Sequence, residues 1–190
     1  CVEDMQWPKG YVEEIANQKK TLNEEDLGFL RVLRINLHLA GFLGDPSKKI
    51  AITDEGEAFL DRMKPGTRMA RLFQTFFAEF NLSLMWEMAD EASLAFQETV
   101  PYMLLVVHRK CGHWTSLDEV VQTCLLPSVL DEITLNGEAE PDLACQVVSS
   151  RFLIPLIWMG LLEFNEDKDE DLVRKTPLFD RFISFDLKSK

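Results

Sequence analysis

Hydrophobic positions recur with a helical period over most of the chain. The clearest run follows Thr67, where apolar side chains stand at positions i, i+3, i+4, i+7, i+8 and i+11: Met69, Leu72, Phe73, Phe76, Phe77 and Phe80. This spacing puts them on one face of a helix with 3.6 residues per turn. We therefore expect an amphipathic helix that begins with Thr67 as its N-cap and buries these aromatic rings.

The same analysis predicts further helices over residues 26–43, 102–110, 117–125 and 142–162, the third opened by a Thr115–Ser116 capping sequence. The last of them contains Pro155, which should kink the helix or split it in two. Two short strands are expected, over residues 49–53 and 172–174. The fold class is therefore mostly α.

The surroundings of the two strands resemble each other. Each follows a helix that ends in glycine, Gly41 or Gly160, and each is followed by a threonine, Thr53 or Thr176, that starts a helix. A phenylalanine comes six residues after each threonine, and the loop between glycine and threonine is four residues longer, and acidic, in the second copy. We interpret this as an internal repeat.

A helix, a glycine, a loop, a strand and a capped helix follow one another in this order in the second half of many winged-helix domains, where the loop is the wing. We therefore expect two winged-helix-like units with short β-hairpin wings, residues 1–66 and 111–190, joined by amphipathic helices over residues 67–110. The alternative is a plain helical bundle in which the pattern recurs by chance.

A partial likeness to a known group covers about a third of the chain. It is carried by Leu33, residues 39–42, Ile52 with Thr53, Gly56, residues 58–60, and a following amphipathic helix with Phe76 and Phe77. Through these residues the segment 30–85 resembles an uncharacterised bacterial family whose helical module lies beside passenger-type domains of insertion-sequence or plasmid origin. The resemblance brings no catalytic residues. In fold and charge alone, an acidic tandem winged-helix pair is similar to the bacterial chromosome-condensation accessory subunits, which bind protein partners.

The chain is acidic, with 20 Lys plus Arg against 32 Asp plus Glu and a net charge of −12. Such a charge repels phosphate backbones unless basic residues gather locally, so it disfavours DNA as a partner. The four cysteines form no C-x-x-C pair, and the longest uncharged apolar run, residues 152–162, is far shorter than the roughly 20 residues that cross a bilayer. We expect a cytoplasmic protein that does not enter membranes.

If DNA is bound, the first unit offers the candidate residues: Arg31, Arg34 and His38 on one helix and Lys48 and Lys49 on the adjoining loop. At 100° per residue the three helical side chains span only about 60° of the circumference. Nearly all the rest of that helix is apolar, so we expect it to be mostly buried, whereas a helix that reads a groove needs a broad polar face. The second unit has a single cation in its corresponding helix and an acidic wing.

Two other clusters contain chemically capable side chains. His108, Cys111 and His113 are metal ligands by type, although a zinc site takes four and the simpler interpretation is a helix C-terminus. Met85, Trp86 and Met88 suit a ligand cavity or a partner groove, but such clusters more often belong to a core.

Enzyme signatures are missing: no G-x-S-x-G, no phosphate-binding glycine loop and no H-E-x-x-H occur. We therefore expect a non-enzymatic protein-interaction module in a bacterial cell, without a cofactor. Two alternatives stay open: a DNA-binding transcriptional regulator that acts through the first winged helix, and a helical domain that binds a small molecule.

Overall fold

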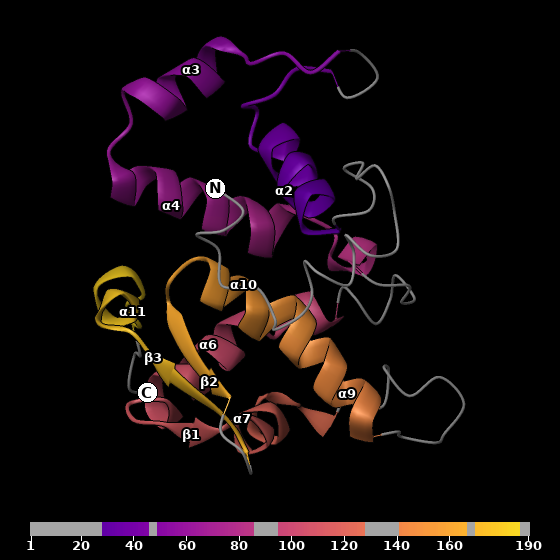
Figure 1. The fold of residues 1–190 in the computed structure, drawn as a ribbon, viewed down its shortest axis with the longest axis vertical. Coiled ribbons are helices and arrows are strands. Elements are labelled where there is room, and N and C mark those ends of the chain that lie inside the picture. The colour runs from indigo at the N-terminus through magenta and orange to yellow at the C-terminus, as the bar shows by residue number, and fades with distance from the viewer. Residues whose placement is uncertain (1–27, 46–48, 86–94, 128–140, 167–169, 187–190) are drawn as a thin grey trace. The chain divides into compact units, whose positions relative to one another are not determined.

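The computed structural model describes residues 28–45, 49–85, 95–127, 141–166 and 170–186 (Figure 1). The chain forms two compact units, residues 1–80 and 81–190. The amphipathic helix that follows residue 64 falls within the first unit, although the sequence analysis assigned it to a connecting segment that starts at residue 67. Within the described residues, no helix combines the length and the apolar character that a bilayer crossing requires.

The first unit is helical. Its described elements are α2 (Gly28–Leu39), α3 (Asp54–Asp61), α4 (Pro65–Gln74) and a π-helix, η2 (Thr75–Glu79). Helix α4 starts two residues before Thr67, because Pro65 supplies the favoured first position with Lys64 as N-cap; the predicted Thr67 cap is wrong. The predicted aromatic face is confirmed, since Phe76, Phe77 and Phe80 are buried.

The hairpin expected in the first unit is reduced to a single antiparallel bridge between Leu43 and Ile52. Two backbone hydrogen bonds flank it, from Gly44 N to Ala51 O at 2.9 Å and from Thr53 N to Phe42 O at 3.1 Å.

The second unit contains a short 3₁₀ helix, η3 (Leu82–Met85), and the helices α6 (Val100–Lys110), α7 (Leu117–Cys124) and α9 (Pro141–Val148). Helix α9 continues into a π-helix, η4 (Ser149–Leu153), and then α10 (Ile154–Trp158). The predicted interruption at Pro155 is therefore confirmed, because the regular α-helical pattern breaks just before that proline, and the helical run ends at residue 158 rather than 162.

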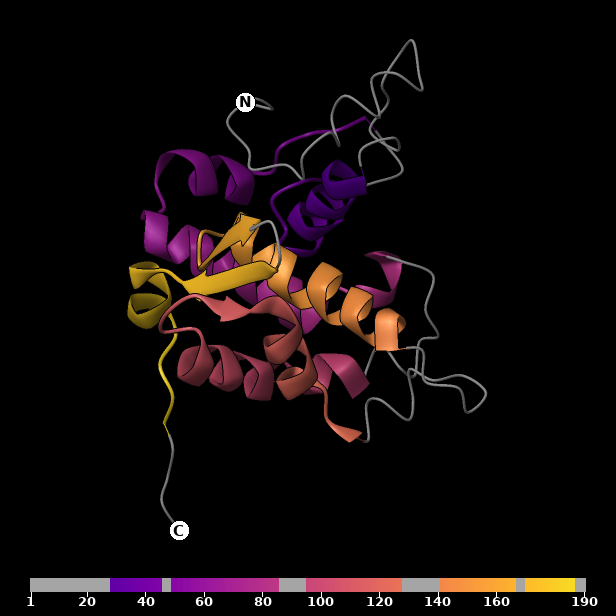
Figure 2. The ribbon, with the colours of Figure 1, turned by 60° about the horizontal axis from the view of Figure 1, so that its bottom comes forward.

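A three-stranded antiparallel sheet completes the second unit, in the order β1–β3–β2. Its strands are β1 (Thr115–Ser116), β2 (Leu162–Glu166) and β3 (Asp171–Lys175), and helix α11 (Pro177–Phe182) follows. Strand β1 was not expected: Thr115 pairs with Val173, and Ser116 makes no side-chain cap for α7. Figure 2 shows β2 and β3 as a hairpin after α10, with β1 beside β3.

The core of the second unit draws side chains from most of these elements, though none of the buried ones comes from β1. Residues with no measurable exposure include Phe96, Met103, Val107, Val120, Phe152, Leu156, Val173 and Phe179. Helix α7 packs against α6 and α9 and contacts β3, and α10 contacts β2. Helices therefore cover one face of the sheet, and its outer face lies at the surface.

The predicted repeat is confirmed in its hydrogen bonds. Gly41 (φ +79°) and Gly160 (φ +70°) both adopt the left-handed conformation that glycine tolerates best. At each helix end the glycine N–H donates three residues back, to His38 O or Ile157 O, and the next N–H donates five residues back, to Leu37 O or Leu156 O. Both helices thus end in the same Schellman motif.

Candidate functional site

The basic residues predicted on the first unit do not form a broad exposed face. Arg31 and Lys49 are exposed, whereas Arg34 and His38 are half-buried, and Lys48 lies outside the described residues. The His38 ring lies against the end of its own helix, with Nδ1 3.3 Å from the carbonyl oxygen of Leu43. One ring nitrogen of His38 therefore contacts the backbone just beyond its helix, while the other, Nε2, is buried without a hydrogen-bond partner among the described residues.

Helix α2 also differs from the mostly buried helix that its sequence predicts. Leu33 and Leu39 are 40% and 42% exposed, while Val32, Asn36 and Ala40 form the buried row at four-residue spacing. The surface of α2 thus carries leucines where a helix in a DNA groove would present groups for bases and phosphates.

In the second unit, residues 141–158 form the helical run that precedes the β2–β3 hairpin. Arg151 is the single cation among them, and it is 1% exposed. Burial lowers the pKa of this guanidinium, because removal from water disfavours the charged form. Arg151 lies in the core and does not reach a phosphate at the surface.

The three predicted metal ligands differ in their exposure to solvent. His108 and His113 are exposed, whereas Cys111 is completely buried, and its burial raises the pKa of the thiol to about 11. Nowhere in the described part of the chain do three His, Cys, Asp or Glu side chains converge as a metal site would require.

Of the predicted groove residues, Met85 is described: it ends the 3₁₀ helix η3 and is half-buried. Trp86 and Met88 lie outside the described residues.

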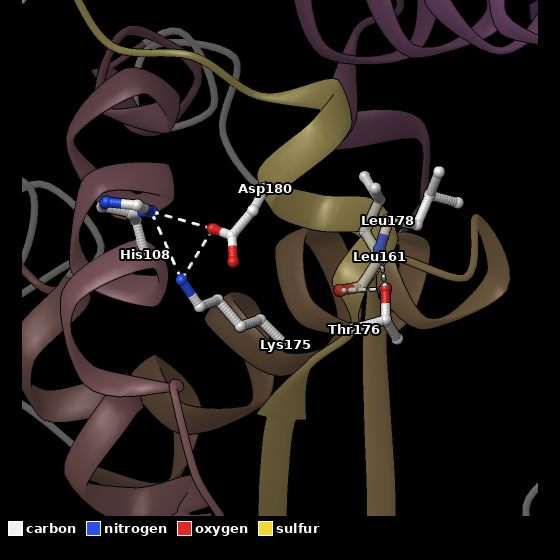
Figure 3. Close-up of polar contacts among 6 residues, drawn as sticks. All are labelled: His108, Leu161, Lys175, Thr176, Leu178 and Asp180. Carbon is white, nitrogen blue, oxygen red and sulfur yellow. Dashed lines mark hydrogen bonds and ion pairs between the residues drawn. The ribbon is translucent and has the colours of Figure 1, made fainter.

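A polar cluster that the sequence did not predict joins α6, β3 and α11 (Figure 3). Asp180 Oδ1 lies 3.2 Å from His108 Nδ1 and accepts a hydrogen bond from Lys175 Nζ at 2.7 Å. This hydrogen bond from Lys175 is the main cause that lowers the pKa of Asp180. The His108 ring also stacks near Phe179, at 6.4 Å between centroids. The cluster holds α11 against α6, which is a structural role.

A second unpredicted feature is a row of side chains across the outer face of the sheet. The Arg174 guanidinium lies over the Trp114 ring, 4.5 Å from its centroid. Its Nε and Nη2 atoms donate to Glu163 Oε2 across the strand pair, at 3.2 and 2.5 Å. Only the strand register brings these three residues together, since 60 residues separate Trp114 from Arg174 along the chain. The row is at the surface, with Trp114 37% exposed.

The β2–β3 hairpin ends in negative charge. Glu166 stands directly opposite Asp171, and Glu170 precedes that residue; all three are exposed. Like charges at paired positions of a sheet repel each other. We call these three residues the acidic hairpin end. The predicted acidity of this loop is therefore confirmed at the surface for these three residues, while residues 167–169 lie outside the described residues.

Comparisons of the chain with protein-family models, with curated proteins and with solved structures found no match. The resemblance of residues 30–85 to a bacterial module therefore stays a prediction.

Proposed function

We propose that this protein is a non-enzymatic module that binds another protein, and that its second unit is a winged helix in architecture. The order α6, β1, α7, α9 to α10, β2, β3 is the order helix, strand, helix, helix, strand, strand of that fold, and the sheet order β1–β3–β2 supports the assignment. In this interpretation the run α9–η4–α10 takes the place of the recognition helix, and the β2–β3 hairpin is the wing.

The observation that carries the proposal is the burial of Arg151. A winged helix that reads DNA presents cations to phosphates from the recognition helix and the wing. Here the one cation of residues 141–158 is in the core, and the wing ends in Glu166, Glu170 and Asp171. The recognition helix thus presents no exposed cation in its described side chains, and the two cations of the hairpin, Arg174 and Lys175, are paired with Glu163 and Asp180, which favours a protein partner.

The surface of the second unit also has the composition of protein interfaces. Trp114 and Arg174 belong to the residue types that contribute most to binding between proteins, and they stack on each other at the outer face of the sheet. Phe164, which is 41% exposed, adds an aromatic ring on the other face of the sheet, opposite Val173. Aromatic and guanidinium groups gathered around a short sheet suit a polypeptide ligand.

Polarisation of a labelled DNA duplex tests the proposal against the DNA-binding alternative. At about 50 mM salt we expect only weak binding by the 190-residue chain, because its net charge of −12 opposes a polyanion. Tight binding that weakens steeply with salt and is lost in Arg31→Ala and Arg34→Ala would establish the alternative. Arg109→Ala, which removes an exposed cation from another helix, is the matched control.

A pull-down with the full chain as bait, treated with nuclease, tests the positive statement. We expect a protein that binds again when both components are purified. Trp114→Ala should weaken that complex, while Tyr102→Ala, at an equally exposed aromatic residue on α6, should leave it unchanged. Loss of the complex on nuclease treatment would contradict the proposal.

A further inference from the structure

On strand β2, the register with β3 determines which backbone N–H and C=O groups point away from β3. Thr176 N donates to Leu161 O, which makes these two residues a hydrogen-bonded pair that continues the register of β2 with β3. Hydrogen-bonded and non-hydrogen-bonded pairs alternate in an antiparallel ladder. The backbone groups of Glu163 and Asn165 therefore face β3, whereas those of Leu162, Phe164 and Glu166 face away from it.

An independent contact supports this assignment. Lys175 stands opposite Leu162 in the register, and its N–H donates to Cys111 O at 2.8 Å on the side of β3 that is remote from β2. Lys175 and Leu162 are thus a non-hydrogen-bonded pair, as the alternation requires. Since β2 is the last strand of the sheet and pairs with β3 alone among the described residues, its outward groups form an open edge.

The side chains along this edge are exposed in the half of the strand that lies farthest from α10. Phe164 is 41% exposed, and Asn165 and Glu166 are exposed as well. Leu162, at the other end, is 2% exposed and anchors the strand in the core. The edge therefore offers two exposed residues, Phe164 and Glu166, whose N–H and C=O groups point outward.

We propose that this edge binds an extended basic segment of a partner protein, which adds a fourth strand beside β2. The inference rests on the proposed function and names the site and the chemistry of its partner. Backbone hydrogen bonds to Phe164 and Glu166 supply the pairing, as in other strand-addition complexes. A lysine or arginine of the added strand lies next to Glu166 and relieves its repulsion with Asp171.

Charge argues for a basic partner and against a second copy of the chain. Two β2 strands paired edge to edge would bring two acidic hairpin ends together on molecules that each carry a net charge of −12. Short strands with charged side chains are a common protection against such self-pairing. The same charges attract a cationic segment, and salt should weaken that attraction.

Hydrogen exchange measured by NMR on the full chain tests the site directly. The probe is a short acetylated peptide that alternates lysine with valine and threonine; control peptides replace lysine by glutamate or place a proline at the centre. We expect the basic peptide to slow exchange at the Phe164 and Glu166 amides. The amides of Glu163 and Asn165, which already bond to β3, should change little. The two control peptides should protect none of the four.

Variants separate the backbone from the side chains. Phe164→Pro removes one outward N–H but no hydrogen bond to β3. We expect this variant to bind the basic peptide about tenfold more weakly, which is the effect of one or two lost backbone hydrogen bonds. Phe164→Ala keeps that N–H and should bind more tightly than the proline variant. Glu166→Lys should also weaken binding, whereas Glu98→Lys, at an exposed acid before α6, should not.

Binding of the basic peptide without protection at Phe164 and Glu166 would overturn the inference, as would equal binding by the proline and alanine variants. Protection of these amides in concentrated protein without peptide would overturn it in favour of self-pairing. None of these results affects the proposed function. That proposal is tested separately, by the DNA polarisation and pull-down measurements.

Discussion

The side-chain hydroxyl of Thr176 donates a hydrogen bond to the backbone carbonyl of Gly160, at 2.8 Å. The same oxygen accepts from Leu178 N at 3.2 Å, so one hydroxyl closes the end of α10 and the start of α11 together. Thr53 repeats this in the first unit, with 2.7 Å to Gly41 O and 3.0 Å from Gly56 N. Each threonine holds two helices across the loop that separates them.

These hydroxyls should contribute measurably to stability. Thr53→Val and Thr176→Val keep the side-chain shape but remove the acceptor for the helix N–H, and loss of such a cap costs about 1 kcal/mol. Thr53→Ser and Thr176→Ser retain the hydroxyl and serve as controls. Urea unfolding curves of the four variants give the comparison; valine variants as stable as the serine variants would show that the caps contribute nothing.

Gly56 is required for a different reason, which is space. A Cβ atom at this position would lie 2.2 Å from Phe42 O and 2.8 Å from Ile52 Cγ2, and the first of these is rigid backbone. We expect Gly56→Ala to lower the free energy of unfolding by about 2 kcal/mol or more, in the range of overpacked sites.

Gly66→Ala is the matched control, because nothing lies within 4 Å of its would-be Cβ. In helix α4, alanine should be neutral or more stable by up to about 1 kcal/mol. Thermal unfolding followed by circular dichroism measures both. Equal effects at the two glycines would rule out crowding as the cause.

The Lys175–Asp180 contact predicts a dependence of stability on pH. The pKa of Asp180 is lowered from its ordinary 3.8 in the folded protein, chiefly by the Lys175 hydrogen bond. The ionised carboxylate therefore stabilises the fold above the unfolded pKa, and this contribution is lost as the pH falls through the folded pKa.

Asp180→Asn should accordingly be less stable than the wild type at pH 7, by about 0.5 kcal/mol for a half-exposed ion pair. The difference should shrink below pH 4 and vanish once Asp180 is protonated. Asp186→Asn, at an exposed acid for which the described part of the structure gives no ion pair, is the control. A difference that persists at pH 2 would mean that Asp180 acts through packing rather than charge.

Cysteine alkylation tests how tightly the core of the second unit is packed. Burial raises the pKa of Cys111 to about 11 and that of Cys124 to about 12, so both remain thiols at pH 8 and react slowly. Cys145 is half-buried and should be alkylated by iodoacetamide first of the three. Mass spectrometry of digested samples, native and in urea, measures the order, and rapid native modification of Cys124 would contradict the packing.

Local sequence signals identified the residues at which elements end or break, although the helices predicted over residues 26–43 and 142–162 end at residues 39 and 158. Glycine at a left-handed helix end, threonine before a helix and proline inside one act through hydrogen bonds within a few residues, so Gly41, Gly160, Thr53 and Pro155 were recognisable from neighbours alone. The predicted Thr67 cap failed because Pro65, two residues earlier, is the stronger start signal.

The amino-acid sequence thus determined by itself the helical character, the buried aromatic row, the repeated glycine–threonine pattern and the acidity of residues 166–171. Tertiary structure alone decided the rest. The two-residue strand β1 exists because Val173 pairs with Thr115, and the His108–Lys175–Asp180 cluster forms because β3 and α11 return to the end of α6. The burial of Arg151 and the open edge of β2 likewise depend on packing and register, which join residues that no local spacing connects.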